Sequence, residues 1–72
     1  MVILVTDQKG RQAIVRIQEI PEVGSVIRIE NIAKKLTGES LPQGNYYVEQ
    51  RSPNEVSETE YGSLPSFMIK EE

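Results

Sequence analysis

The sequence contains no cysteine and no histidine. Without cysteine, neither disulfides nor thiolate metal sites can stabilise a chain of this size. Because both residue types are missing, Ser-His and Cys-His nucleophile pairs cannot be assembled, and the usual zinc ligands are absent. We therefore expect a protein that is not an enzyme and that has no metal site and no cofactor.

Long apolar runs are also lacking. The apolar residues 2–5 are too few for a membrane span or for the core of a signal peptide, and they have no basic flank or cleavage site. No glycine-rich phosphate-binding pattern occurs either. We expect a cytoplasmic protein without membrane association and without nucleotide chemistry.

Carboxylates offer the one formal route to acid-base chemistry, because Glu55, Glu58 and Glu60 are close in sequence. A perturbed carboxyl pKa requires burial or close like charges, and nothing apolar surrounds these glutamates. Their spacing does not match a calcium-binding loop. We interpret this stretch as a hydrated acidic segment.

The length of 72 residues indicates one domain, residues 1–72, near the lower limit for independent folding. The net charge of −3 is unevenly spread. Residues 1–36 include six basic and four acidic residues, whereas residues 37–72 include two basic and seven acidic residues. This asymmetry is typical of a solvated surface with an acidic tail, and it would also allow steering of a charged partner.

Valine and isoleucine recur with a period of two at residues 13–20 and 26–30, which predicts two strands. Between them, Pro21 fixes a turn-like φ and Gly24 can take a positive φ, so the chain is expected to reverse there. We predict that these two runs pair as an antiparallel hairpin with Ile17 and Ile27 facing the core.

Residues 2–5 are almost continuously apolar, which predicts a strand covered on both faces. Residues 7–10 supply turn-forming side chains and lead into the run at residues 13–20. Together with the Pro-Gly turn, these segments predict a three-stranded meander over the first 30 residues.

Two strands are predicted in the second half, at residues 45–51 and 66–70. In the first of them, Tyr46 and Val48 are expected inside, because successive side chains of a strand point to opposite faces. The residues expected outside are Tyr47, Glu49 and Arg51. In the last strand, Phe67 and Ile69 are expected inside.

Helical signals occur in two places. Residues 31–36 are predicted as a short helix capped by Asn31 and ended by Gly38. Residues 52–62 begin with a capping-box pattern, but they have few apolar residues. A short acidic helix or an ordered loop is expected there, with disorder as the alternative.

The order of these elements is typical of a mainly β fold. We predict a small five-stranded barrel, OB-like or alternatively SH3-like, with one or two short helices. Small barrels without catalytic residues commonly act as adaptors, inhibitors or subunits, so we expect a non-catalytic protein-binding module that uses a strand edge or its acidic surface. A phage-encoded inhibitor that occupies a basic groove is one form of this hypothesis.

The alternative is an OB-like protein that binds single-stranded nucleic acid, with Arg11, Arg16 and Arg28 on the phosphates and Tyr47 as a stacking surface. Homo-oligomerisation through Leu4 and Val26 is a third hypothesis, because so small a core would gain stability from an interface. The candidate binding residues are charged or aromatic residues expected at the surface: Arg16, Arg28, Lys34, Lys35, Tyr47, Glu49 and Arg51.

Overall fold

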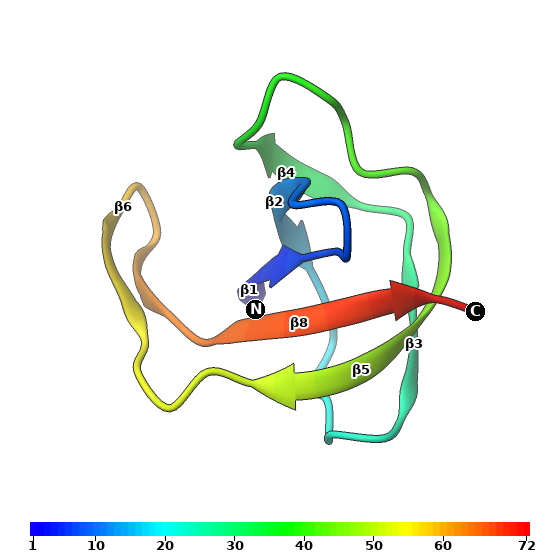
Figure 1. Cartoon of the computed structure of the whole chain (residues 1–72). Coiled ribbons are helices and arrows are strands. Elements are labelled where there is room, and N and C mark those ends of the chain that lie inside the picture. Colours follow the sequence, from blue (N-terminus) through cyan, green and yellow to red (C-terminus); the bar gives the residue numbers. More distant parts are fainter.

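Eight strands and no helix make up the computed structural model, which covers residues 1–72 (Figure 1). In chain order the strands are β1 Val2–Thr6, β2 Gln12–Arg16, β3 Val26–Ile29, β4 Ile32–Lys35, β5 Gly44–Arg51, β6 Val56–Thr59, β7 Gly62–Leu64 and β8 Ser66–Glu71. Six of them form one curled sheet in the order β3-β5-β8-β1-β2-β4, and β6 pairs with β7 separately. The prediction of a mainly β fold is confirmed, and the curled sheet is consistent with a small barrel.

The concave face of the curled sheet holds the core. Its residues come from every strand of the large sheet except β4, together with one loop leucine: Ile3, Val5, Ala13, Val15, Ile27, Ile29, Leu41, Tyr46, Val48, Phe67 and Ile69. Most are β-branched or aromatic side chains, which pack well on a pleated surface. The predicted inward positions of Tyr46, Val48, Phe67 and Ile69 are confirmed, because all four are fully buried.

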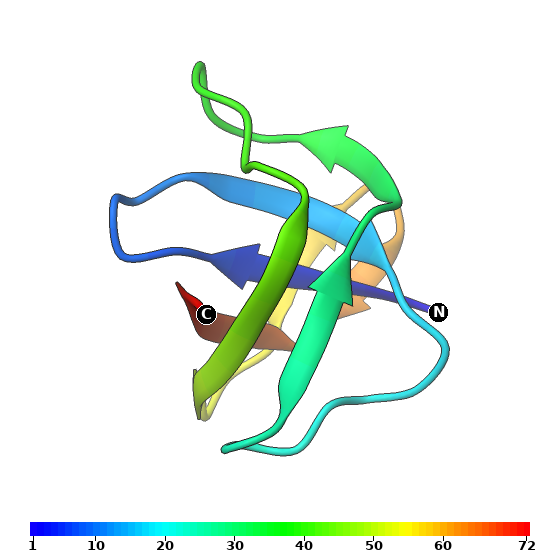
Figure 2. The same cartoon turned by 90° about the vertical axis from the view of Figure 1, so that its right-hand side faces the viewer.

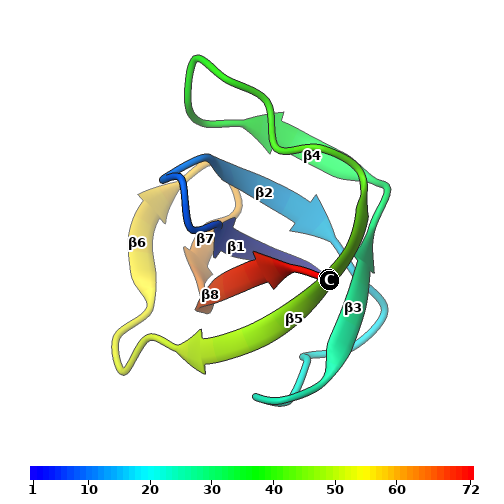
Figure 3. The ribbon, with the colours of Figure 1, turned by 45° about the vertical axis from the view of Figure 1, so that its right-hand side comes forward.

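β1 is buried on both faces, as its continuous apolar run predicts. Ile3 and Val5 point into the core, whereas Leu4 and its partner Ile14 on β2 are also buried but lie outside the core cluster. The hairpin of β6 and β7 lies beside this second face, where Val56 and its neighbours share a hollow with Leu4 and Ile14 (Figure 3). The hairpin therefore covers an apolar surface that the large sheet would otherwise expose.

A corner between β3 and β4 closes the curl of the sheet. Only Glu30 and Asn31 separate the two strands, yet β3 pairs with β5 and β4 pairs with β2 (Figure 2). The Asn31 carbonyl accepts a hydrogen bond from the Arg16 N–H at 2.9 Å, which fixes the end of β2 at the corner. One bent segment thus joins the two ends of the sheet.

The predicted meander is wrong in its second half. β1 and β2 pair as expected, but β2 pairs with β4 rather than with β3. Gly24 does lie in a turn, which follows Pro21 and which Ser25 closes by donating its N–H to Glu22 O. The turn reverses the chain only after residues 17–21 have left the sheet, so the reversal does not bring β2 and β3 together.

The helix predicted for residues 31–36 is also wrong, because residues 32–35 form β4. So short a helix is marginal in water unless packing holds it. As a strand, the same residues gain backbone hydrogen bonds to β2, and Ile32 still packs against the core.

A hairpin replaces the helix or loop predicted for residues 52–62. Val56 lies opposite Leu64, and Glu58 takes a positive φ of 63° within β6, where the register between Val56 and Thr59 is irregular. Thr59 Oγ1 accepts a hydrogen bond from the Tyr61 N–H at 3.1 Å. Val56 is partly buried and Tyr61 is exposed, so this segment lacks the apolar stripe that an amphipathic helix would bury.

Two neighbouring residues of β3 test the inward face. Ile27→Asp should lower the free energy of unfolding by about 3 kcal/mol or more, since it buries an unpaired carboxylate. Val26→Asp, on the outer face, should change it by less than about 1 kcal/mol. Denaturant unfolding followed by circular dichroism measures both, and equal stability of the two variants would contradict the assigned faces.

Candidate functional site

One edge of the large sheet is open along β3. The Val48 N–H donates to Ser25 O at 2.9 Å, so the backbone of Val48 faces the β3 side of β5. Because backbone groups of a strand alternate in direction, Tyr46 also faces β3, and it lies opposite Ile27. The backbone of Ile27 therefore pairs with β5.

The same alternation turns Val26 and Arg28 the other way. Their N–H and C=O groups point away from β5, toward the side of β3 that has no neighbouring strand. No turn, loop or side-chain hydrogen bond engages these groups. β3 thus presents unpaired donors and acceptors, which are the groups that an added strand would use.

A hollow lies beside this edge. The connection between β2 and β3 runs alongside β3, and an open hollow of about 770 Å³ is lined by residues 16–22 and by residues 25–28, 30 and 31. We call this hollow the β3 groove. Its position places the open edge on one wall and the loop on the other.

The charges of the β3 groove differ in whether they are paired. Arg28 Nε donates to Glu30 Oε2 at 3.0 Å, and both side chains are well exposed. No hydrogen bond or ion pair engages the guanidinium of Arg16 or the carboxylates of Glu19 and Glu22. The groove therefore has three free charges in addition to one neutralised pair.

Of the predicted binding residues, only Arg16 and Arg28 line the β3 groove. Tyr47 lies on the outer face of β5, between Val26 of β3 and Lys70 of β8. The Tyr47 side chain is 43% exposed. Lys70 was not predicted as a binding residue, since the sequence does not reveal which strand lies beside β5.

The other predicted residues lie elsewhere. Lys34 Nζ pairs with Glu60 of the β6–β7 hairpin, and Lys35 Nζ donates to the Gly38 carbonyl at 3.3 Å. The Arg51 guanidinium lies 5.4 Å from the centre of the Phe67 ring. Glu49 is exposed on β5. The seven predicted residues therefore do not form one site.

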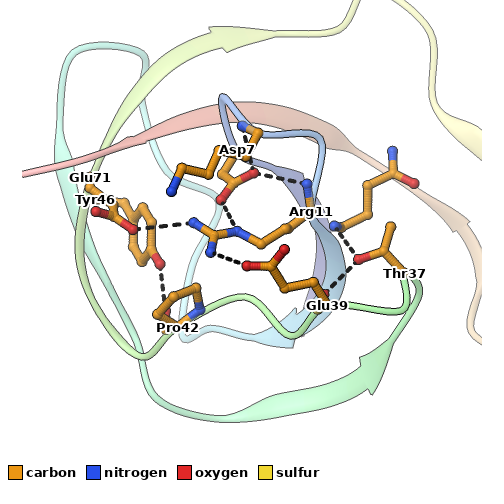
Figure 4. A network of polar contacts seen from close by, with 9 residues as sticks. Asp7, Arg11, Thr37, Glu39, Pro42, Tyr46 and Glu71 are labelled. Atoms are coloured by element: carbon orange, nitrogen blue, oxygen red, sulfur yellow. Dashed lines mark hydrogen bonds and ion pairs between the residues drawn. The ribbon is translucent and has the colours of Figure 1, made fainter.

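Arg11 is buried in a polar network just before β2, at the opposite end of that strand from Arg16 (Figure 4). Its Nε donates to Asp7 Oδ2 at 2.6 Å, its Nη1 to Glu39 Oε1 at 3.0 Å and its Nη2 to Glu71 Oε1 at 3.3 Å. Three carboxylates thus accept hydrogen bonds from the Arg11 guanidinium. The sequence analysis assigned this group to phosphate binding, but it is already paired. The separation of four residues between Asp7 and Arg11 was visible in the sequence, but nothing there linked them to Glu39 or Glu71.

This network shifts three pKa values. Burial alone would raise the pKa of Asp7, but hydrogen bonds from the Arg11 side chain and from the Arg11 and Lys9 N–H groups lower it below its ordinary value of 3.8. The bond to Asp7 in turn raises the pKa of Arg11. Burial raises the pKa of Tyr46, whose hydroxyl donates to the Pro42 carbonyl. The network is therefore a fixed, ionised closure of the core.

Comparison of this chain with models of protein families, with curated proteins and with solved structures gave no match. No helix that could cross a membrane is present. No group of three or more acidic, histidine or cysteine side chains is arranged to hold a metal ion. The β3 groove and the outer face around Tyr47 are the two surfaces on which a functional proposal can be based.

The lowered pKa of Asp7 predicts acid sensitivity. Its stabilising contribution is complete above about pH 5 and is lost as the pH falls further, because the unfolded chain takes up the proton more readily than the folded chain. The melting temperature of the wild type should therefore fall more steeply than that of Asp7→Asn between about pH 5 and about pH 2. Thermal unfolding at several pH values measures this, with Glu39→Gln as the control for an exposed partner. Parallel curves for wild type and Asp7→Asn would contradict the assignment.

Proposed function

We propose that this protein is a non-catalytic module that binds an extended segment of a partner protein by β-addition to the open edge of β3. The observation that carries the proposal is the pair of unpaired backbone residues, Val26 and Arg28, beside a groove. In β-addition the main-chain hydrogen bonds supply affinity, and neighbouring side chains supply specificity. Both elements are present in the β3 groove.

A comparison of the two sheet edges supports β3 as the binding edge. The other edge is β4, where Lys34 and Lys35 are exposed and Lys34 is tied to the β6–β7 hairpin. Lysines on an edge strand disfavour pairing with another chain. Along β3, in contrast, the single cation Arg28 is neutralised by Glu30, and the loop stands beside the edge with a hollow between them.

We further propose that the curled sheet is the SH3-like kind of small barrel. If β3 and β4 are counted as one bent strand, the strands follow one another around the sheet in chain order, and the parallel pair of β1 and β8 joins first to last. An OB barrel has a Greek-key order instead. The sequential order therefore supports the SH3-like alternative.

Proline at the open edge tests β-addition. Val26→Pro removes the N–H that points into the groove without removing a bond to β5, and proline is tolerated on edge strands. We expect the variant to fold but to bind an extended peptide at least about tenfold more weakly, because a main-chain hydrogen bond is lost and its partner is left unpaired. Chemical-shift titration of the isotope-labelled protein with valine- and threonine-rich peptides measures this.

Val26→Thr is the matched control, because it keeps the N–H and the β-branched shape. Arg28→Pro repeats the test at the second unpaired residue, in case Ser25 does not accept a following proline. Peptide shifts that avoid residues 25–31, or equal affinity of the proline and threonine variants, would contradict the proposal. Sedimentation of the protein alone distinguishes peptide binding from pairing of β3 with a second copy.

Nucleic-acid binding is the second candidate, and one observation favours it. Tyr47, Lys70 and Arg28 share the outer face of the sheet, which combines an exposed aromatic ring with two cations. Base stacking on aromatic rings and phosphate contacts to cations are the usual means of binding single strands. Glu30 already neutralises Arg28, however, and the chain is acidic overall, so β-addition remains the preferred function.

Labelled oligonucleotides test this second candidate. If the outer face binds single strands, affinity should fall steeply between low and moderate salt, and Tyr47→Ala should lower it by roughly fivefold or more. Fluorescence anisotropy measures both effects, and Tyr61→Ala is the control, since Tyr61 is similarly exposed on the β6–β7 hairpin. No change in anisotropy at low salt would exclude this function.

A further inference from the structure

Two of the three free charges of the β3 groove lie at its two ends. Arg16 is at the corner, where its backbone N–H bonds to the Asn31 carbonyl. Glu22 is at the other end, where its carbonyl accepts the Ser25 N–H just before β3 begins. Both side chains are exposed and neither has an ionic partner. The open edge therefore runs from a negative end to a positive end.

The paired charges in the middle of the groove do not cancel the difference in charge between its two ends. Arg28 and Glu30 neutralise one another across 3.0 Å, so they add no net charge. Glu19, the remaining free charge, lies on the loop between Arg16 and Glu22, so the loop carries negative charge at both of its free carboxylates and positive charge only at Arg16. Ile17 and Ile20 supply apolar surface along the same wall. A bound segment would therefore meet opposite charges at its ends and mixed apolar contacts between them.

We infer, on the basis of the proposed function, that the β3 groove prefers one arrangement of charges along the chain direction of its ligand. The preferred ligand is an extended segment that has an acidic residue toward its N-terminus and a basic residue toward its C-terminus. Antiparallel pairing is more stable per residue and more frequent than parallel pairing. The N-terminal part of an antiparallel ligand lies beside the C-terminal end of β3, where Arg16 is, and its C-terminal part lies beside Glu22.

The length of the edge sets the spacing of the two charges. A strand rises about 3.3 Å per residue, so the edge from Ser25 to Asn31 spans about 20 Å. Arginine and glutamate side chains can reach inward from its ends, which brings the matching ligand residues to about four to six positions apart. An even spacing keeps both ligand side chains on the same face of the added strand, because side chains alternate.

A pair of peptides with the same composition tests the inference. The forward peptide has glutamate followed four residues later by lysine, with threonine and valine elsewhere, and the reversed peptide exchanges the two charged residues. We expect the forward peptide to bind roughly threefold to tenfold more tightly at low salt, in the range expected for two exposed ion pairs, and the difference to shrink at high salt. Titrations followed by amide chemical shifts give both affinities.

A charge exchange in the protein supplies the decisive comparison. The double variant Arg16→Glu with Glu22→Lys should invert the preference, so that the reversed peptide binds more tightly. The control double variant, Lys9→Glu with Glu55→Lys, makes the same exchange at exposed positions outside the groove and should leave the order unchanged. Both double variants keep the net charge of the chain.

The outcomes separate this inference from the function on which it rests. If both peptides shift residues 25–31 with equal affinity, or if the reversed peptide binds the wild type more tightly, the directional reading is overturned while β-addition stands. If neither peptide shifts these residues, β-addition and the directional reading are overturned together.

Discussion

The corner at Glu30 and Asn31 determines most of what is distinctive in this molecule. A four-residue strand on each side of the corner pairs with a different part of the sheet, so one short segment joins its two ends around the core. The hydrogen bond from the Arg16 N–H to the Asn31 carbonyl fixes the end of β2 at this point. From there the chain must travel back to the start of β3, and the loop that makes this return becomes the second wall of the groove. The open edge and the groove are therefore consequences of one bend.

An unpaired edge is tolerable only if the core does not depend on it. Domains of this size bury a smaller share of their surface than larger domains do, so each part that covers the core contributes noticeably to stability. Here Arg11 and its three carboxylates close the core just before β2, and the outer face of β1 is covered by the β6–β7 hairpin. The bonds from Arg11 hold the β1–β2 turn against Glu39 and Glu71 of other segments. Neither of these two closures uses the free side of β3, which stays open.

The sequence predicted which face of the sheet each side chain occupies better than it predicted which strands pair. Alternation identified Tyr46 and Phe67 as buried and Tyr47 as exposed, because side-chain direction in a strand is a local property. Pairing is not local. The Pro-Gly turn was read as a hairpin, although Gly24 bonds to Val48 of a distant strand instead. Residues 31–36 were read as a helix from the local signals at Asn31 and Gly38, although residues 32–35 pair with β2 as a strand.

The candidate site shows the same difference between local properties, which the sequence predicts, and non-local contacts, which it does not. Arg16 and Arg28 were recognised as exposed cations, but the sequence could not show that Arg28 is neutralised by Glu30 while Arg16 is free. Nor could it show that Glu22, which was read as part of a turn, lies at the other end of an open edge. In this protein the positions of the charged side chains say more about binding than the net charge does. At physiological ionic strength, charges are screened over about 8 Å, so a ligand in the groove would respond mainly to the charged groups nearest to it. Recognition there depends on the few unpaired groups that line it, and these differ between its two ends.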